Sequence, residues 1–261
     1  MAQIDHRYVH GASASRVGTG VAVDEGLRAH MLRVYNYLAA GIGVAAILAY
    51  AVYNASVTTD PALAVATLRN GVLLTPFGKA LFASGWIMGI KLAPIGLLLI
   101  LAFTAQRLST GATQLAYWAL VALIGAGAST AFIQYKLGSV GQVFAITALS
   151  FAALSLWGYT TKRDLSGWGS FLFMGLIGII LASIANIFFH SGPLQFAISV
   201  IGVLVFAGFT AYDTQRIKDE YYLMLGDAAA MSKAAVWGAL SLFIDFVNLF
   251  QLLLSLLGDR E

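Results

Sequence analysis

The segment that decides the fold is VWGALSLFIDFVNLFQLLLSLL, which runs from Val236 to Leu257. It is long and apolar enough to cross a bilayer, since a transmembrane helix needs about 20 mostly apolar residues. Polar side chains still recur along it at intervals of three or four: Ser241, Asp245, Asn248, Gln251 and Ser255. That spacing places them on one face of a helix. We predict that this face turns toward the protein interior or toward a water-filled path, because lipid would not solvate it.

Six further apolar windows precede this segment. They are Val34–Asn54, Trp86–Ala105, Leu115–Tyr135, Val140–Thr160, Gly169–Phe189 and Leu194–Gln215. The 261-residue chain is 59% hydrophobic and 10% charged, with a mean hydropathy of +0.82, whereas soluble domains carry about 25% charged residues. The windows are continuous runs, unlike the alternating segments of a membrane β-barrel. We therefore predict an all-α integral membrane protein with seven transmembrane helices.

The distribution of lysine and arginine predicts the domain limits and the orientation. We expect a polar cytoplasmic N-terminal tail over residues 1–33, a membrane domain over residues 34–257 and a short C-terminal tail over residues 258–261. Basic residues then fall mostly on one side of the membrane: Arg7, Arg16, Arg28, Arg33, Arg107, Lys162, Arg163, Arg216, Lys218 and Lys233. Because cytoplasmic loops are enriched in Lys and Arg, we predict a cytoplasmic N-terminus and a C-terminus on the outer side.

Composition excludes several classes of function. A net charge of +3 is too small to indicate a nucleic-acid partner. The chain has no cysteine, which excludes disulfides, thiolate metal sites and cysteine nucleophiles. The four histidines are scattered, without the spacing of a helix-borne zinc site. We expect no catalytic residues and no cofactor, and the lipid bilayer as the main surrounding partner.

Two acidic residues, Asp213 and Asp245, lie inside apolar windows. A charge in the hydrocarbon region costs several kcal/mol, so it is usually paired, protonated or exposed to water. At 1.5 Å per residue, Asp213 lies about 8 Å and Asp245 about 13 Å from the cytoplasmic ends of their helices. The two carboxyl groups can therefore meet if the last two helices are neighbours.

Two carboxyl groups in contact at low dielectric cannot both ionise cheaply, so the pair would titrate as a unit with one proton shared. Such a pair can sense pH, and when ionised it offers hard oxygen ligands to a cation such as calcium. Ser241, Asn248 and Gln251 would line the adjoining path. The alternative is that each aspartate pairs separately with a base or caps a helix. The candidate counter-charges are Arg216, Lys218 and Lys91.

The run Phe206-Ala-Gly-Phe-Thr-Ala-Tyr-Asp-Thr-Gln-Arg-Ile-Lys218 resembles the signature of the Bax inhibitor-1 family, and Phe243-Ile-Asp-Phe-Val-Asn-Leu-Phe250 resembles its last helix. The resemblance covers essentially the whole membrane region. It implies a bacterial inner-membrane protein of seven helices, with the last helix central and wrapped by the other six. It also implies an aspartate dyad at Asp213 and Asp245. Some members carry a base that contacts the dyad; Lys91 is the only basic residue in the second window.

The resemblance to this family implies two alternative functions. One is a pH-sensitive calcium leak gated by Asp213 and Asp245. The alternative is a regulator, without transport, of a membrane-anchored ATP-dependent protease, which would engage the N-terminal tail. An intramembrane aspartyl protease is disfavoured, because such enzymes carry the second aspartate after Gly-x-Gly and this chain has Leu242-Phe243-Ile244 before Asp245.

Overall fold

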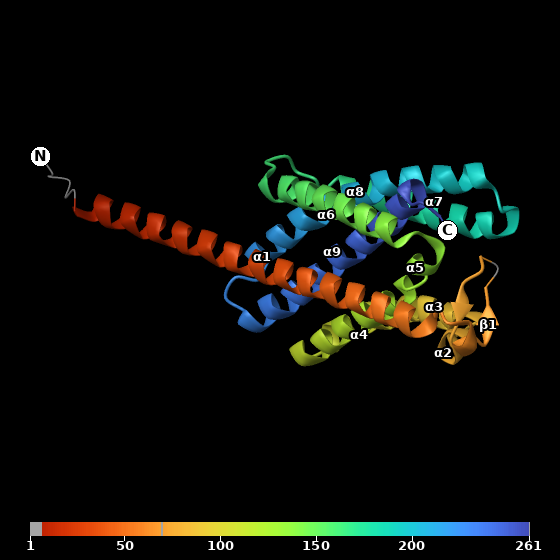
Figure 1. Cartoon of the computed structure of the whole chain (residues 1–261). Helices are drawn as coiled ribbons and strands as arrows, with labels where there is room; N and C mark the ends of the chain where they lie inside the picture. The colour runs from red at the N-terminus through yellow and green to blue at the C-terminus, as the bar shows by residue number, and fades with distance from the viewer. Residues whose placement is uncertain (1–6, 69, 261) are drawn as a thin grey trace, which may run out of the picture.

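The computed structural model describes residues 7–68 and 70–260. Its elements run in the order α1 Arg7–Ser56, η1 Pro61–Leu63, β1 Ala66–Thr67, β2 Leu73–Leu74, α2 Pro76–Gly78, the π-helical turn η2 Lys79–Ala83, α3 Trp86–Thr104, η3 Ala105–Arg107, α4 Thr110–Ala128, α5 Ala131–Gln134, α6 Leu137–Thr160, α7 Trp168–Phe189, α8 Gly192–Leu223 and α9 Ala228–Leu257 (Figure 1). Within the described residues, seven helical segments are long and apolar enough to cross a membrane. This confirms the predicted fold class.

Short polar residues set the starts of the later helices. The hydroxyl of Ser109 accepts a hydrogen bond from the backbone N–H of Ala112 at the start of α4. Ser191 does the same for Leu194 in α8, where Pro193 occupies the first turn. The Asp227 carboxylate caps α9. Side-chain oxygens at this position satisfy N–H groups that have no partner within the helix, so these three residues define where α4, α8 and α9 begin.

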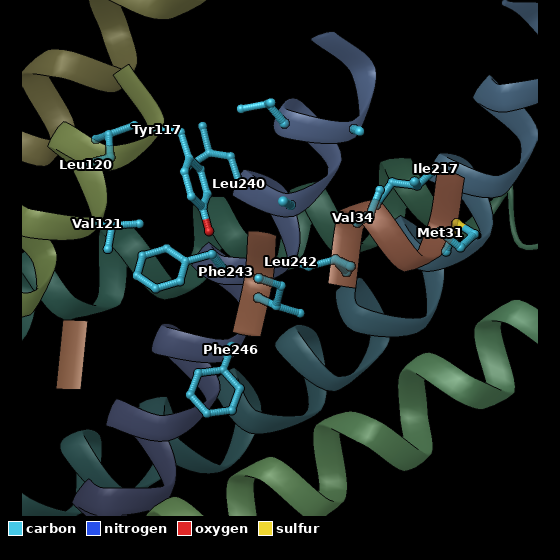
Figure 2. Packing of buried hydrophobic residues seen from close by; sticks show 14 of the residues in the cluster. Met31, Val34, Tyr117, Leu120, Val121, Ile217, Leu240, Leu242, Phe243 and Phe246 are labelled. Carbon is cyan, nitrogen blue, oxygen red and sulfur yellow. The ribbon is translucent and has the colours of Figure 1, made fainter. Parts of the chain in front are cut away.

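Helix α9 lies at the centre of the packing. It packs along α1, α4, α6 and α8, while α3 packs mainly on α4 and α7 on α8. Leu242 and Phe243 of α9 are fully buried, and Figure 2 shows them among Tyr117 of α4, Val34 of α1 and Ile217 of α8. The central position expected for the last helix is observed, but the expected wrapping by all six others is not, because α3 and α7 form an outer layer.

Glycines allow the closest helix approaches. A Cβ added at Gly158 of α6 would collide with the backbone of Ala211 in α8, and one at Gly125 of α4 would lie 2.8 Å from the Cα of Ala45 in α1. Small residues at such crossings are how membrane helices gain van der Waals contact. The α6–α8 crossing therefore depends on the absence of a side chain at position 158.

We expect Gly158→Ala to destabilise the protein by about 1–3 kcal/mol, the usual cost of overpacking. The backbone of Ala211 cannot yield as a flexible side chain would. The matched control is Gly138→Ala in the same helix, where an added Cβ meets no atom within 4 Å. Thermal unfolding in detergent measures both, and equal melting temperatures for the two variants would contradict the close crossing.

The first helix begins earlier than predicted. The sequence placed its start near Val34, whereas α1 is helical from Arg7. Leu27 and Met31 are buried in the main core, and the ring of His30 lies 5.4 Å from that of Tyr221 in α8. The end of the predicted polar tail is therefore part of the bundle.

Two segments pack against the end of the bundle where α1 ends. The segment between α1 and α3 folds back onto the end of α1, with Thr75 Oγ1 donating to the carbonyl of Ala55 at 2.7 Å. The predicted C-terminal tail is also tied down, since the Asp259 carbonyl accepts from the Lys136 N–H at 3.0 Å. Arg260 lies over the ring of Tyr135, 5.8 Å from its centroid.

Candidate functional site

The two intramembrane aspartates lie on adjacent helices, Asp213 on α8 and Asp245 on α9. Both are buried, with 7% and 4% of their surfaces exposed. Their carboxyl groups are close enough for electrostatic repulsion, and the charge of Arg216 attracts both. Helices α8 and α9 pack against each other, which is the condition that the sequence left open.

Arg216 connects the two helices at this point. Its Nη2 lies 3.3 Å from Asp213 Oδ1 and donates to Ser241 Oγ of α9 at 3.1 Å. Its Nε lies 3.6 Å from Glu220 Oε1. Among the described residues, Asp245 Oδ2 is buried without any hydrogen-bond partner. Asp213 thus has a base of its own, whereas Asp245 has only the more distant attraction of Arg216.

The three candidate counter-charges have different surroundings in the structure. Arg216 pairs with Asp213, as the alternative interpretation allowed. Lys218 does not, because its Nζ donates to the carbonyl of Tyr159 at 3.0 Å and lies over that ring. Lys91 lines a cavity beside Gly127 of α4 and forms no ion pair within the described residues. Lys218 and Lys91 are therefore not counter-charges of the aspartates here.

The polar face predicted on α9 is divided between helix α8 and a cavity. Ser241 and Asp245 face α8, and Ser255 accepts a hydrogen bond from Ser199 of α8 at 3.1 Å. Asn248 and Gln251 instead line a cavity of about 450 Å³ between α3, α4, α5 and α9, which we call the polar cavity. Among the described residues of this face, only Asn248 and Gln251 line the polar cavity, whose lining also includes Ile244, the residue before Asp245.

Sequence reasoning missed a chain of hydroxyl groups beside Asp213. Thr214 Oγ1 donates to the Thr210 carbonyl at 2.7 Å, so it must accept from Ser155 Oγ at 2.9 Å. Ser155 then accepts from the Tyr35 hydroxyl at 2.8 Å. The chain joins α1, α6 and α8 and fixes the segment of α8 that carries Asp213. The only sequence signal was the position of Thr214 within the Tyr-Asp-Thr-Gln-Arg run.

Gln215 is the second residue that sequence reasoning missed. Its side-chain amide donates to the Arg163 carbonyl at 2.9 Å and accepts from the Leu165 N–H at 2.8 Å. It therefore holds the α6–α7 loop against α8. The side chains of residues 213 to 216 each form a specific contact, so each of these four residues of the Tyr-Asp-Thr-Gln-Arg run has a structural role.

Comparisons with known proteins assign the chain to a family. Residues 27–261 match the family model described as "Inhibitor of apoptosis-promoting Bax1". The chain is 44% identical to a protein of Caulobacter vibrioides, over 92% of both chains. It is 38% identical to the inner membrane protein YbhL of Escherichia coli, over 90% of this chain and 94% of that one. The protein is a multi-pass membrane protein that belongs to the Bax inhibitor-1 family.

Proposed function

We propose that this protein is a pH-sensitive leak for cations, with calcium as the transported ion and Asp213 and Asp245 as the gate. The observation that carries the proposal is the Asp245 carboxyl, which is buried next to a second carboxyl with one oxygen unpartnered among the described residues. Unpaired buried polar groups are costly. A buried carboxyl group such as that of Asp245 therefore suits a site that binds a proton under one condition and a cation under another.

Charge balance supports this role. When Asp213, Asp245 and Arg216 are all ionised, the three together carry one net negative charge. A proton on the pair removes that charge at acidic pH, and a cation can balance it at higher pH. Glu220 also attracts Arg216, with 3.6 Å between Glu220 Oε1 and Arg216 Nε, and so competes with the pair for its charge. The leak is therefore closed when the pair holds a proton and opens as the pair loses it.

The polar cavity supplies part of a route. Its lining includes Ile244, the residue before Asp245, and Asn248, which lies about 4.5 Å beyond Asp245 along the helix axis. Beyond Asp245, the hydrogen bond from Arg216 to Ser241 holds α8 against α9. Separation of these helices at that bond would extend the cavity past the aspartates. We place the protein in a bacterial inner membrane, as for YbhL, with the N-terminus cytoplasmic and the C-terminus outside.

Calcium flux into liposomes tests the proposal. The purified protein is reconstituted at known orientation, and a trapped calcium dye records the entry rate over a series of pH values. Entry should exceed that of protein-free liposomes and should rise with pH as the pair ionises. Rates equal to those of protein-free liposomes at every pH would exclude the leak.

A second function is favoured by the shape of α1. Its N-terminal part extends beyond the bundle as a helix (Figure 1), in a position to contact another membrane protein such as a membrane-anchored ATP-dependent protease. Because Leu27 and Met31 belong to the core, a clean truncation removes residues 1–24 only. If the helix restrains the protease, this truncation should restore substrate degradation in co-reconstituted membranes and leave calcium flux unchanged. Degradation that is indifferent to the full-length protein would exclude this function.

A further inference from the structure

Lys91 is a basic side chain in a membrane-spanning helix that forms no ion pair with any described residue. It lies in α3 about 8 Å from the start of that helix at Trp86, and its stem passes Gly127 of α4, which has no side chain to block it. Among the described residues, no carboxylate pairs with Lys91. A cation at this depth normally faces a partner or a polar cavity, so the surroundings of Lys91 should indicate what it binds.

The polar cavity around Lys91 is built to receive an anion. Its other polar side chains include the amides of Gln134, Asn248 and Gln251. The Asn248 amide uses one N–H on the Ile244 carbonyl, which leaves the second N–H for another acceptor. None of the described residues that line this cavity is an aspartate or a glutamate. An ammonium group with neighbouring amide donors and no competing carboxylate is the donor set for a carboxylate or a phosphate.

A second cavity adjoins the first. This apolar cavity, of about 370 Å³, lies between α1, α4, α5, α6 and α9 and includes Ile42, Val140, Phe144 and Phe246. The two cavities share six lining residues: Ile124, Ala128, Ala131, Val247, Phe250 and Gln251. Gln251 is the only polar side chain among the described residues of the apolar lining. Each volume is in the range of small-molecule sites, roughly 300–1,000 Å³.

We propose that the two cavities together bind one single-chain anionic amphiphile, a long-chain carboxylate of the fatty-acid class. The carboxylate binds Lys91 and the amides of Asn248 and Gln251, and the hydrocarbon chain fills the apolar cavity. A small hydrated anion would leave the apolar cavity empty, and a neutral lipid would leave Lys91 unpaired. The amphiphile meets both requirements, because it neutralises the cation and buries apolar surface.

Binding of oleate to the full-length protein tests this proposal. The protein is placed in nanodiscs of phosphatidylcholine, and native mass spectrometry with equilibrium titration measures the stoichiometry and the Kd. Oleate should bind saturably, with one molecule per protein. Oleyl alcohol, which has the same chain without the charge, should bind at least about tenfold more weakly. Acetate, which has the charge without the chain, should not displace oleate.

Two variants address the two ends of the ligand. Lys91→Gln removes the charge and should raise the Kd for oleate about tenfold, the loss of one charge-assisted hydrogen bond. Gly141→Leu should block the chain, since Gly141 lines the apolar cavity and an added Cβ there meets no atom within 4 Å. The matched controls are Lys79→Gln, outside both cavities, and Gly138→Leu, one turn before Gly141 and equally free of contacts. Both controls should bind oleate as the parent does.

Three results would overturn the proposal. The first is oleate binding that neither Lys91→Gln nor Gly141→Leu weakens, which would mean association with the lipid-facing surface only. The second is oleyl alcohol binding as tightly as oleate. The third is stoichiometric displacement of oleate by phosphatidylglycerol or by acetate, which would assign the site to a two-chain phospholipid or to a small anion. A bound amphiphile would occupy the cavity assigned above to the calcium route, but the assay records binding and no ion flux, so failure of this proposal and failure of the proposed leak are distinguishable.

Discussion

Asp245→Asn should lower calcium entry at neutral pH by at least about tenfold and should flatten its rise with pH. Asparagine keeps the shape of the side chain but cannot ionise, so the pair can no longer carry the negative charge that a cation balances. A tenfold change in rate corresponds to about 1.4 kcal/mol in activation free energy. Placing a carboxylate at the centre of a membrane helix costs roughly 2.5–3.5 kcal/mol, so loss of the charge is large enough to account for the change. Liposome flux over a pH series measures the rate and its pH dependence together.

The matched control for this variant is Asp219→Asn. Asp219 is on the same helix as Asp213 but is exposed, so its loss changes the charge of the protein without changing the buried pair. Its flux should equal that of the parent. A pH profile for Asp245→Asn that superimposes on the parent profile would show that the pair does not gate the flux. Thermal unfolding checks the fold, and Asp245→Asn should not lower the melting temperature, since it removes an unpaired buried charge.

Arg216→Gln should destabilise the protein at neutral pH by about 2 kcal/mol. This variant removes the only positive charge that, among the described residues, acts on both aspartates. Breaking a fully buried ion pair costs roughly 3–5 kcal/mol. The expected loss is smaller because 41% of the Arg216 side chain is exposed. Since the cost comes from ionised carboxyl groups, it should be largest at high pH and should shrink as acid protonates them.

Two further variants make this prediction specific. Lys218→Gln removes a charge two residues from Arg216 that contacts Tyr159 and not the aspartates. This variant should therefore lose less stability than Arg216→Gln, and its loss should not depend on pH. Asp213→Asn combined with Arg216→Gln should recover part of the loss, because one buried charge is then removed. An equal loss for Arg216→Gln at acidic and alkaline pH would contradict the electrostatic account.

The membrane-spanning segments were predictable because hydropathy is a local property of the sequence. A continuous apolar run of about 20 residues has few alternatives to a transmembrane helix, and each predicted window overlaps one of the observed long helices. The third window, Leu115–Tyr135, runs past the end of α4 at Ala128 into α5, and α8 ends and α9 begins eight residues outside the predicted limits Gln215 and Val236. The start of α1 was not predictable in this way. Leu27 and Met31 alternate with Arg28 and Arg33, so average hydropathy hides an amphipathic turn whose apolar side packs into the core.

At the aspartates, helix geometry distinguishes the two bases that the sequence analysis treated alike. Arg216 is three residues from Asp213 and shares its face, whereas Lys218 is five residues away and lies about 140° around the helix. Spacing alone therefore favoured Arg216 over Lys218 as the partner of Asp213. The partners of Thr214 and Gln215 could not be found this way, because Ser155 and Leu165 lie 59 and 50 residues distant. Such contacts depend on which helices are neighbours, which hydropathy does not specify.

The division of the α9 polar face has a similar origin. A spacing of three and four places Ser241 and Gln251 on one broad face, but successive residues on it drift around the helix and meet different neighbours. Ser241 meets α8, whereas Gln251 faces the two cavities. The sequence thus indicated the polar groups correctly as a set, but only the packing shows which of them can act together.

The separation of the Asp213 and Asp245 carboxyl oxygens at acidic and at alkaline pH tests the central claim most directly. Crystals of the protein grown or equilibrated at the two pH values provide this distance. A shared proton predicts an oxygen–oxygen distance of about 2.5–3.0 Å at acidic pH. At alkaline pH the account predicts a wider separation, with the Arg216 to Ser241 hydrogen bond broken. The same separation at both pH values, with that bond intact, would contradict a gate formed by this pair.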